Sequence, residues 1–288
     1  RLTYAERAIW VNDRAKAVLA MTAPDRFGAA AFDQGSLADF LLADRLPERT
    51  ATEDPFGYAS GVLEYGWNIE PGAAREVFLR VPFHGVQTGG ALPPTDADAA
   101  ALETQLLEQA RSDWEARLDR VKLELPPAAQ KLADAIKSNL AYILINRNGP
   151  AIQPGSRTYA RSWIRDGALT SAALLGMGYT DEVRQFLLWF TPYQQPDGKV
   201  PCCVDQRGAD PVPEHDSHGQ LIYAIMEYYR YTRDVGFLRE MWPFVVKAVG
   251  YIDSLRQQRL TDQYRTDPAS VPYWGLVPES ISHEGYSS

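Results

Sequence analysis

The hydrophobic pattern of the chain differs between residues 1–90 and the part after residue 127. In the first part, apolar and polar residues alternate over short stretches such as GVLEYGWNI and REVFLRVPFHG, which is typical of β-strands. The pair Pro71-Gly72 between these two stretches indicates a tight turn. We therefore expect a mainly β unit over residues 1–90, with one short helix in SLADFLLADRL.

The next stretch has the composition of a linker followed by a helix. TGGALPPTDAD is rich in residues that form turns and loops. Asp96 or Asp98 is placed to cap a long helix whose apolar residues recur at helical spacing. Because Pro126-Pro127 is expected to end that helix, we assign residues 91–126 to a linker helix.

After residue 127 the pattern is helical. Helices are predicted over residues 128–146, 166–177, 181–190, 217–231 and 235–255. The second and fourth of these are mostly apolar, which predicts buried helices, whereas the helix after each of them is amphipathic. A buried helix followed by a half-exposed one, repeated, is typical of two concentric helical layers. The long loops 191–216 and 256–284 hold aromatic and acidic residues, and we expect them to be functional.

Composition and charge narrow the range of partners. The chain has 288 residues, of which 45% are hydrophobic, so it can bury a large core. A net charge of −8 argues against a nucleic acid as partner, and no apolar run approaches the roughly 18 residues of a membrane-spanning helix. The adjacent Cys202 and Cys203 suit neither an unstrained disulfide nor a zinc site, so we interpret them as small apolar side chains. We expect no metal and no cofactor, and the compartment stays open.

The first of three acidic turns between helices lies in RTYARSWIRDGALTSAALLGMG. Arg165 and Asp166 stand at the start of a helix, behind the aromatic Trp163. Charged groups can hold sugar hydroxyls bidentately, and a flat aromatic face can stack on a sugar ring. We therefore expect these three residues to bind a carbohydrate. The alternative is structural, with Asp166 as an N-cap and Arg165 as its surface ion partner.

The second acidic turn, PVPEHDSHGQLIYAI, places two carboxylates and two imidazoles before the next buried helix. Glu214 and Asp216 are interpreted as a second charged wall of a binding cleft. A metal site is the competing interpretation, but His215 and His218 flank a helix start, whereas zinc needs three or four convergent ligands. The structural alternative makes Asp216 or Ser217 a helix cap and leaves Glu214 in solvent.

The third acidic turn, GLVPESISHEGY, carries the candidates for catalysis. Glu279 and Glu284 are the two candidate general acids, and Glu279 is preferred. A general acid needs a pKa raised by apolar or like-charged surroundings, which Trp274 and its neighbouring tyrosines could supply. Trp274, in a loop, is also a candidate stacking surface for the substrate. This interpretation requires the turns of Asp166, Asp216 and Glu279 to open at the same rim.

These motifs resemble those of the six-hairpin (α/α)6-barrel glycosidases, a clan that includes glucoamylases, trehalases and bacterial glycogen-debranching-like proteins. In that clan a Trp-x-Arg-Asp motif opens the second helix, and its Asp grips sugar hydroxyls in subsite −1. Trp163, Arg165 and Asp166 match this motif. PEHDSHGQLIYAI is similar to the opening of the fourth helix, where the clan places further sugar-binding charges. GLVPESISHEGY falls before the sixth, where glucoamylase-like members carry their general acid.

The resemblance covers about residues 55–288 and implies an α+β fold. Residues 1–90 would form part of a β-sandwich, residues 91–126 the linker helix, and residues 127–288 the first part of an (α/α)6 toroid. The clan's barrel has twelve helices, and the sequence predicts five after residue 127. We therefore expect a fragment, with the catalytic base and the rest of the barrel on a missing segment.

The function implied by the resemblance is hydrolysis of an α-linked glucan or a related oligosaccharide, by inversion and without metal. Inversion places the two carboxyls roughly 6.5–9.5 Å apart, so that the base can activate a water molecule on the face of the sugar opposite the acid. A glycoside phosphorylase on the same fold is an alternative, but it needs a cationic pocket for phosphate. A non-catalytic carbohydrate-binding protein is a second alternative. A polysaccharide lyase is a third, and it would require a basic cleft.

Overall fold

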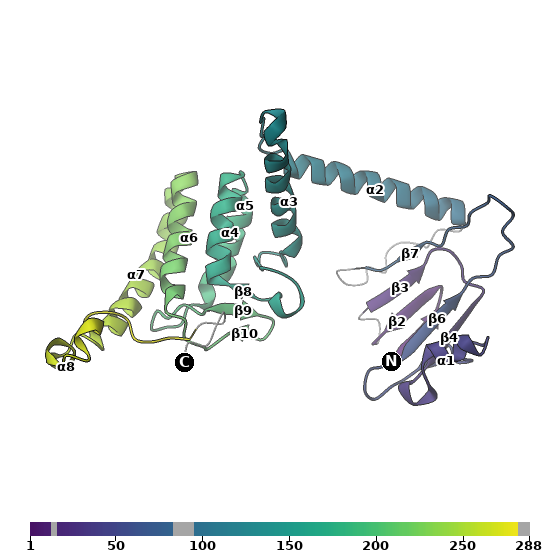
Figure 1. Ribbon diagram of the computed structural model, residues 1–288, viewed down its shortest axis with the longest axis horizontal. Coiled ribbons are helices and arrows are strands. Elements are labelled where there is room, and N and C mark those ends of the chain that lie inside the picture. The colour runs from purple at the N-terminus through teal and green to yellow at the C-terminus, as the bar shows by residue number, and fades with distance from the viewer. Residues whose placement is uncertain (13–15, 83–94, 282–288) are drawn as a thin grey trace. The chain divides into compact units, whose positions relative to one another are not determined.

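The computed structural model describes residues 1–12, 16–82 and 95–281. It divides into two compact units, residues 1–113 and residues 114–288 (Figure 1). The predicted α+β class is confirmed, since antiparallel sheets and helices are both present. The β-sandwich, the toroid and the assigned domain bounds stay predictions. In the described part of the chain, no helix is long and apolar enough to cross a membrane.

The N-terminal unit is built on two antiparallel sheets. Their strands are β1 (Leu2–Ala5), β2 (Ala8–Val11), β3 (Lys16–Ala20), β4 (Arg26–Ala30), β5 (Ala51–Thr52), β6 (Ser60–Glu64) and β7 (Leu79–Arg80). One sheet has the strand order β5-β1-β2-β3-β7, and the other pairs β4 with β6. The predicted short helix is α1 (Leu37–Leu42), capped by Ser36. In the described part of REVFLRVPFHG the strand is β7, two residues that pair with Leu19 and Ala20, and residues 83–85 lie outside the described residues.

The long predicted helix is α2 (Asp96–Leu118). Its cap is Thr95, and the expected caps Asp96 and Asp98 lie inside the helix instead. The Thr95 hydroxyl accepts the Asp98 N–H at 3.1 Å and donates to the Asp98 carboxylate at 2.6 Å. The helix ends at Leu118, well before Pro126-Pro127, so the expectation that the prolines terminate it is wrong.

The C-terminal unit contains the five predicted helices. They are α3 (Gln130–Asn146), α4 (Ile164–Gly176), α5 (Thr180–Phe190), α6 (Asp216–Thr232) and α7 (Val235–Gln257). The loops add a short helix, α8 (Asp262–Thr266), and a small antiparallel sheet of β8 (Ser162–Trp163), β9 (Cys203–Asp205) and β10 (Gly208–Ala209). Neither the sheet nor α8 was expected from the hydrophobic pattern, because each element is too short to show a period.

Helices α4 and α6 pack side by side and run parallel (Figure 1). Their first turns are joined by an ion pair between Arg165 and Asp216. At the other end, the Tyr231 hydroxyl of α6 lies beside Gly176, the last residue of α4. Helix α5 packs on both of them, and α7 packs on α6.

The core of this unit lies between α4, α5, α6 and α7. Its largest fully buried side chains include Phe186, Phe190 and Phe237. Gly167 permits the close approach of α4 and α5, since a Cβ there would lie 2.4 Å from the Phe186 ring. The expectation that α4 is buried on all sides is wrong, because Leu169 is 60% exposed. Helix α6 likewise has an exposed side, with Tyr223 and Met226.

Candidate functional site

The first acidic turn lies where strand β8 passes into helix α4. The Ile164 N–H donates to the Cys202 carbonyl at 2.9 Å, and the buried Ser162 hydroxyl donates to the Ile152 carbonyl at 2.6 Å. Trp163 occupies the N-cap position, so Asp166 is a first-turn residue and the interpretation of Asp166 as the N-cap is wrong. A carboxylate in the first turn is favoured by the helix dipole. The turn therefore holds Trp163, Arg165 and Asp166 on a fixed backbone.

The Arg165 side chain forms ion pairs with residues of the second acidic turn, and these pairs link the first turn of α4 to the start of α6. Its Nε donates to Asp216 Oδ2 at 2.7 Å, and its Nη2 donates to Asp216 Oδ1 at 3.0 Å. Nη2 also lies 3.4 Å from Glu214 Oε2. Two parallel bonds from one guanidinium to one carboxylate form the strong, geometrically specific kind of ion pair. The sequence predicted Asp166 as the ion partner of Arg165, and the structure pairs Arg165 with Asp216 and Glu214 of the second acidic turn.

The side chains of Arg165, Glu214 and Asp216 differ in their exposure to solvent. The Glu214 side chain is 2% exposed, and the Asp216 side chain is 39% exposed. The expectation of a solvated Glu214 in the structural alternative is therefore wrong. The cluster consists of a buried carboxylate, a partly buried guanidinium and an outer carboxylate that can reach a ligand in solvent.

The third acidic turn meets the start of α6. The His215 backbone N–H donates to the Ser280 hydroxyl at 3.2 Å. Ser280 follows Glu279 directly, so the segment of Glu279 lies at the same end of the helices as Arg165 and Asp216. The third turn is thus close to the other two, as the interpretation from sequence requires.

Glu279 itself does not have the surroundings of a general acid. Its side chain is 82% exposed and forms an ion pair with the buried Arg259. A hydrogen bond from its own backbone, followed by the ion pair with Arg259, holds the pKa of Glu279 below its usual value. A general acid needs the opposite shift. The half-exposed Trp274 lies in the same loop, and Glu284 lies outside the described residues.

The two histidines of the second turn are in different surroundings. His218 is 1% exposed, and its Nδ1 accepts the Val200 N–H at 3.1 Å. Burial lowers the pKa of His218 to about 4. The two imidazole rings are 6.2 Å apart between centroids. Across the described residues, no group of three or more His, Cys, Asp or Glu side chains is placed to hold a metal ion.

Sequence reasoning missed the small sheet behind Trp163. Strand β8 pairs with β9, with Ser162 opposite Val204 and Trp163 opposite Cys203. Both cysteines are buried as free thiols, and the neighbouring thiol together with burial raises the pKa of Cys203. The sequence signal for this sheet was the DQRG stretch after Val204, which has the composition of a hairpin turn.

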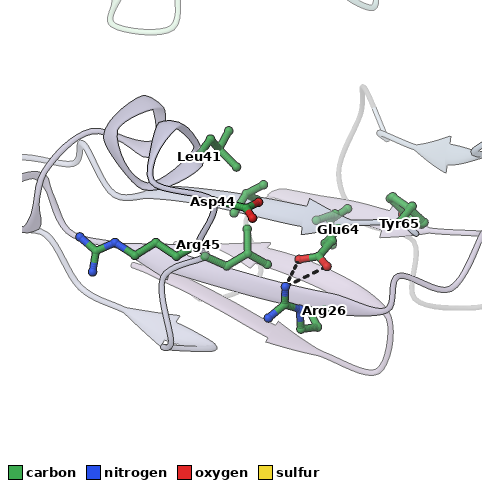
Figure 2. Close-up of a pocket in the computed structure, with 9 residues that line it drawn as sticks. Arg26, Leu41, Asp44, Arg45, Glu64 and Tyr65 are labelled. Atoms are coloured by element: carbon green, nitrogen blue, oxygen red, sulfur yellow. Dashed lines mark hydrogen bonds and ion pairs between the residues drawn. The ribbon is translucent and has the colours of Figure 1, made fainter. Parts of the chain in front are cut away.

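A separate cavity of about 360 Å³ lies in the N-terminal unit and contains no predicted site residue. Figure 2 shows its lining around the ion pair between Arg26 and Glu64, whose shorter N–O distance is 2.6 Å. The Arg45 guanidinium lies 4.9 Å from the centre of the Phe40 ring. This cavity plays no part in the site described above.

Comparison with known proteins gives one match. Residues 128–259 match a family model described as amylo-alpha-1,6-glucosidase. No curated protein and no solved structure matches the chain. The matched range includes the Arg165 cluster and Trp163, and it ends before Glu279. The part of the chain over residues 128–259 is therefore similar to a glycoside hydrolase-like family that acts on glucans.

Proposed function

We propose that the protein is a glycoside hydrolase that acts on an α-linked glucan or a related oligosaccharide by inverting acid/base hydrolysis. The observation that carries the proposal is the cluster of Arg165, Asp216 and Glu214 at the paired N-termini of α4 and α6. This cluster lies within the residues that match the amylo-alpha-1,6-glucosidase family.

The chemistry of the cluster suits a sugar. A sugar hydroxyl both donates and accepts hydrogen bonds, and Arg165 and the half-exposed Asp216 offer a donor and an acceptor close together. Asp166 adds a second carboxylate in the first turn of α4. Trp163, immediately before that turn, offers an apolar face for the ring. We assign these four residues, with the buried Glu214 behind them, to substrate binding.

The order of the helices supports the proposed (α/α)6 toroid. Helices α4 and α6 run parallel, and each is followed by a helix that packs against it, α5 on α4 and α7 on α6. Such a unit places the N-termini of the inner helices at one end. A site formed by successive N-termini is then a consequence of the repeat.

The general acid is not assigned to Glu279. Because the Glu279 carboxyl is exposed and its pKa is lowered by its own backbone and by Arg259, it lacks the raised pKa that a general acid needs. Trp274, which stays a candidate for substrate stacking, lies in the same loop. Glu284 stays a candidate for the acid.

Phosphorolysis on the same fold is less well supported than hydrolysis. Phosphate needs cationic groups that are not already neutralised. The loop arginines Arg161 and Arg207 and the site residue Arg165 all form ion pairs with carboxylates. These pairs reduce the positive charge available for an anion.

The test is glucose release from an α-1,6-branched glucan by the full-length protein, with and without added phosphate. We expect hydrolysis without phosphate, and Asp166→Asn should lower kcat/KM by about 10–100-fold, the worth of one hydrogen bond to a charged group. The melting temperature of this variant should stay nearly unchanged. Asp253→Asn, which alters an exposed ion pair on α7, is the matched control and should leave the rate unchanged.

The other outcomes separate the alternatives. Production of a sugar phosphate, dependent on added phosphate, would show a phosphorylase. Binding of the glucan without turnover would show a carbohydrate-binding protein. Full activity in Asp166→Asn would remove the assignment of this turn to substrate binding.

A further inference from the structure

The small sheet of the C-terminal unit places a set of charges beside Trp163. Strand β8 pairs with β9, and β9 pairs with β10. In this register, Trp163 lies opposite Cys203, and the Asp210 N–H donates to the Cys203 carbonyl at 2.9 Å. Arg161 directly precedes strand β8, two residues before Trp163.

Arg161 forms ion pairs with two carboxylates of the β9–β10 hairpin. Its Nε lies 3.1 Å from Asp205 Oδ2, and its Nη2 lies 2.5 Å from Asp210 Oδ2. All three side chains are largely buried. Screening by water is weaker there than at the surface, so these pairs hold the guanidinium more firmly than an exposed ion pair would.

The two carboxylates are themselves fixed by the turn of the hairpin. Asp205 Oδ1 accepts the Arg207 N–H at 2.8 Å, and Gly208 supplies the positive φ of 105° that closes the turn. Asp210 Oδ1 accepts the Val212 N–H at 3.0 Å. A guanidinium held at both ends by anchored carboxylates has little freedom to move.

The immobilised guanidinium lies against the aromatic side chain. The Arg161 Cζ is 5.3 Å from the centroid of the Trp163 ring, within the range of a cation–π contact. Tyr159 contacts the same ring, with centroids 6.2 Å apart. Trp163 thus contacts both an anchored cation and a second aromatic ring.

We propose that Arg161, anchored by Asp205 and Asp210, is a positioning residue that fixes the Trp163 ring as a stacking surface for a sugar ring of the substrate. This inference rests on the proposed function, in which Trp163 contacts the substrate. An aromatic ring held in its binding orientation loses less conformational entropy when a ligand stacks on it. The hairpin therefore contributes to affinity without touching the sugar.

The test uses Asp210→Asn in the full-length protein. Asparagine keeps the oxygen that accepts the Val212 N–H, and it removes the negative charge that Arg161 contacts. We expect the Kd for a maltooligosaccharide to rise about five- to tenfold, the worth of one aromatic contact, with kcat nearly unchanged. The control is Arg230→Gln, which removes an exposed charge from α6 and leaves the carboxylates that hold Arg161 untouched, so Kd should stay unchanged.

A double-mutant cycle with Trp163→Ala separates positioning from general stabilisation. If Arg161 and Asp210 act through the ring, Asp210→Asn weakens binding in the native background and adds nothing in the Trp163→Ala background. Equal effects of Asp210→Asn in both backgrounds, or no effect in either, would overturn the inference. If Trp163→Ala alone leaves binding unchanged, the proposed function fails at this residue, and that result is distinct from a failure of Asp210→Asn alone.

Discussion

Replacing Arg165 by leucine tests the ionic link between α4 and α6. The variant Arg165→Leu removes the guanidinium that forms ion pairs with both Asp216 and Glu214. The two carboxylates differ in exposure, because the Glu214 side chain is almost completely buried whereas Asp216 is partly in solvent. The matched variant Asp216→Asn removes only the outer carboxylate and leaves Arg165 beside Glu214.

The structure sets the size of the two effects. Taking the cation away from a buried carboxylate costs about 3–5 kcal/mol of unfolding free energy. Breaking a partly exposed ion pair costs about 0.2–1 kcal/mol. For a domain of this size, 1 kcal/mol shifts the melting temperature by roughly 2–4 °C. Arg165→Leu should therefore lower the melting temperature by about 6–20 °C, and Asp216→Asn by less than about 4 °C.

Differential scanning calorimetry of the two variants measures these shifts. Arg165→Lys is the intermediate control, since it keeps a cation near Glu214 and loses the bidentate geometry. Equal shifts for Arg165→Leu and Asp216→Asn would refute the reasoning, because they would show that Glu214 does not depend on the Arg165 charge.

Three further predictions concern packing, protonation and catalysis. Gly167→Ala should destabilise the protein by about 1–3 kcal/mol in denaturant unfolding, because the new methyl group would overlap Phe186; Gly219→Ala, where the space is open, should stabilise it by up to about 1 kcal/mol. His218 has a folded pKa of about 4, below its unfolded value. Stability is therefore lost as pH falls from about 6.5 through 4, by up to about 3 kcal/mol, and a stability–pH curve of His218→Asn should be flatter over this range. Glu279→Gln should lower kcat on an unactivated glucan by less than about tenfold, and a loss of about 10²–10⁴-fold would restore Glu279 as the general acid.

The helices of the C-terminal unit could be predicted from sequence because each is long enough to show a period. The ranges 128–146 and 181–190 differ from α3 and α5 by at most a few residues. The position of the acidic turns followed from the helix boundaries. Their proximity followed only from the resemblance, since no local pattern reports how helices pack.

The contacts of the site could not be predicted from sequence. The pairing of Arg165 with Asp216 joins residues 51 positions apart, and the packing of α4 on α6 brings them together. The lowered pKa of Glu279 depends on a hydrogen bond from its own backbone and on Arg259, which lies in the turn after α7 and is 20 residues away in the chain. Strands of two or three residues, such as β8, are specified by pairing and by buried charges rather than by alternation.

The affinity of the site for a sugar tests the central claim most directly. Isothermal titration of a branched α-glucan oligosaccharide should be compared between the native full-length protein and Arg165→Lys, with Arg230→Lys in an exposed pair of α6 as the control. We predict that Arg165→Lys raises Kd about tenfold or more, because lysine cannot hold Asp216 and a sugar hydroxyl in the geometry of the guanidinium. Arg230→Lys should leave Kd unchanged. The same Kd in all three proteins would contradict a carbohydrate site at the N-termini of α4 and α6.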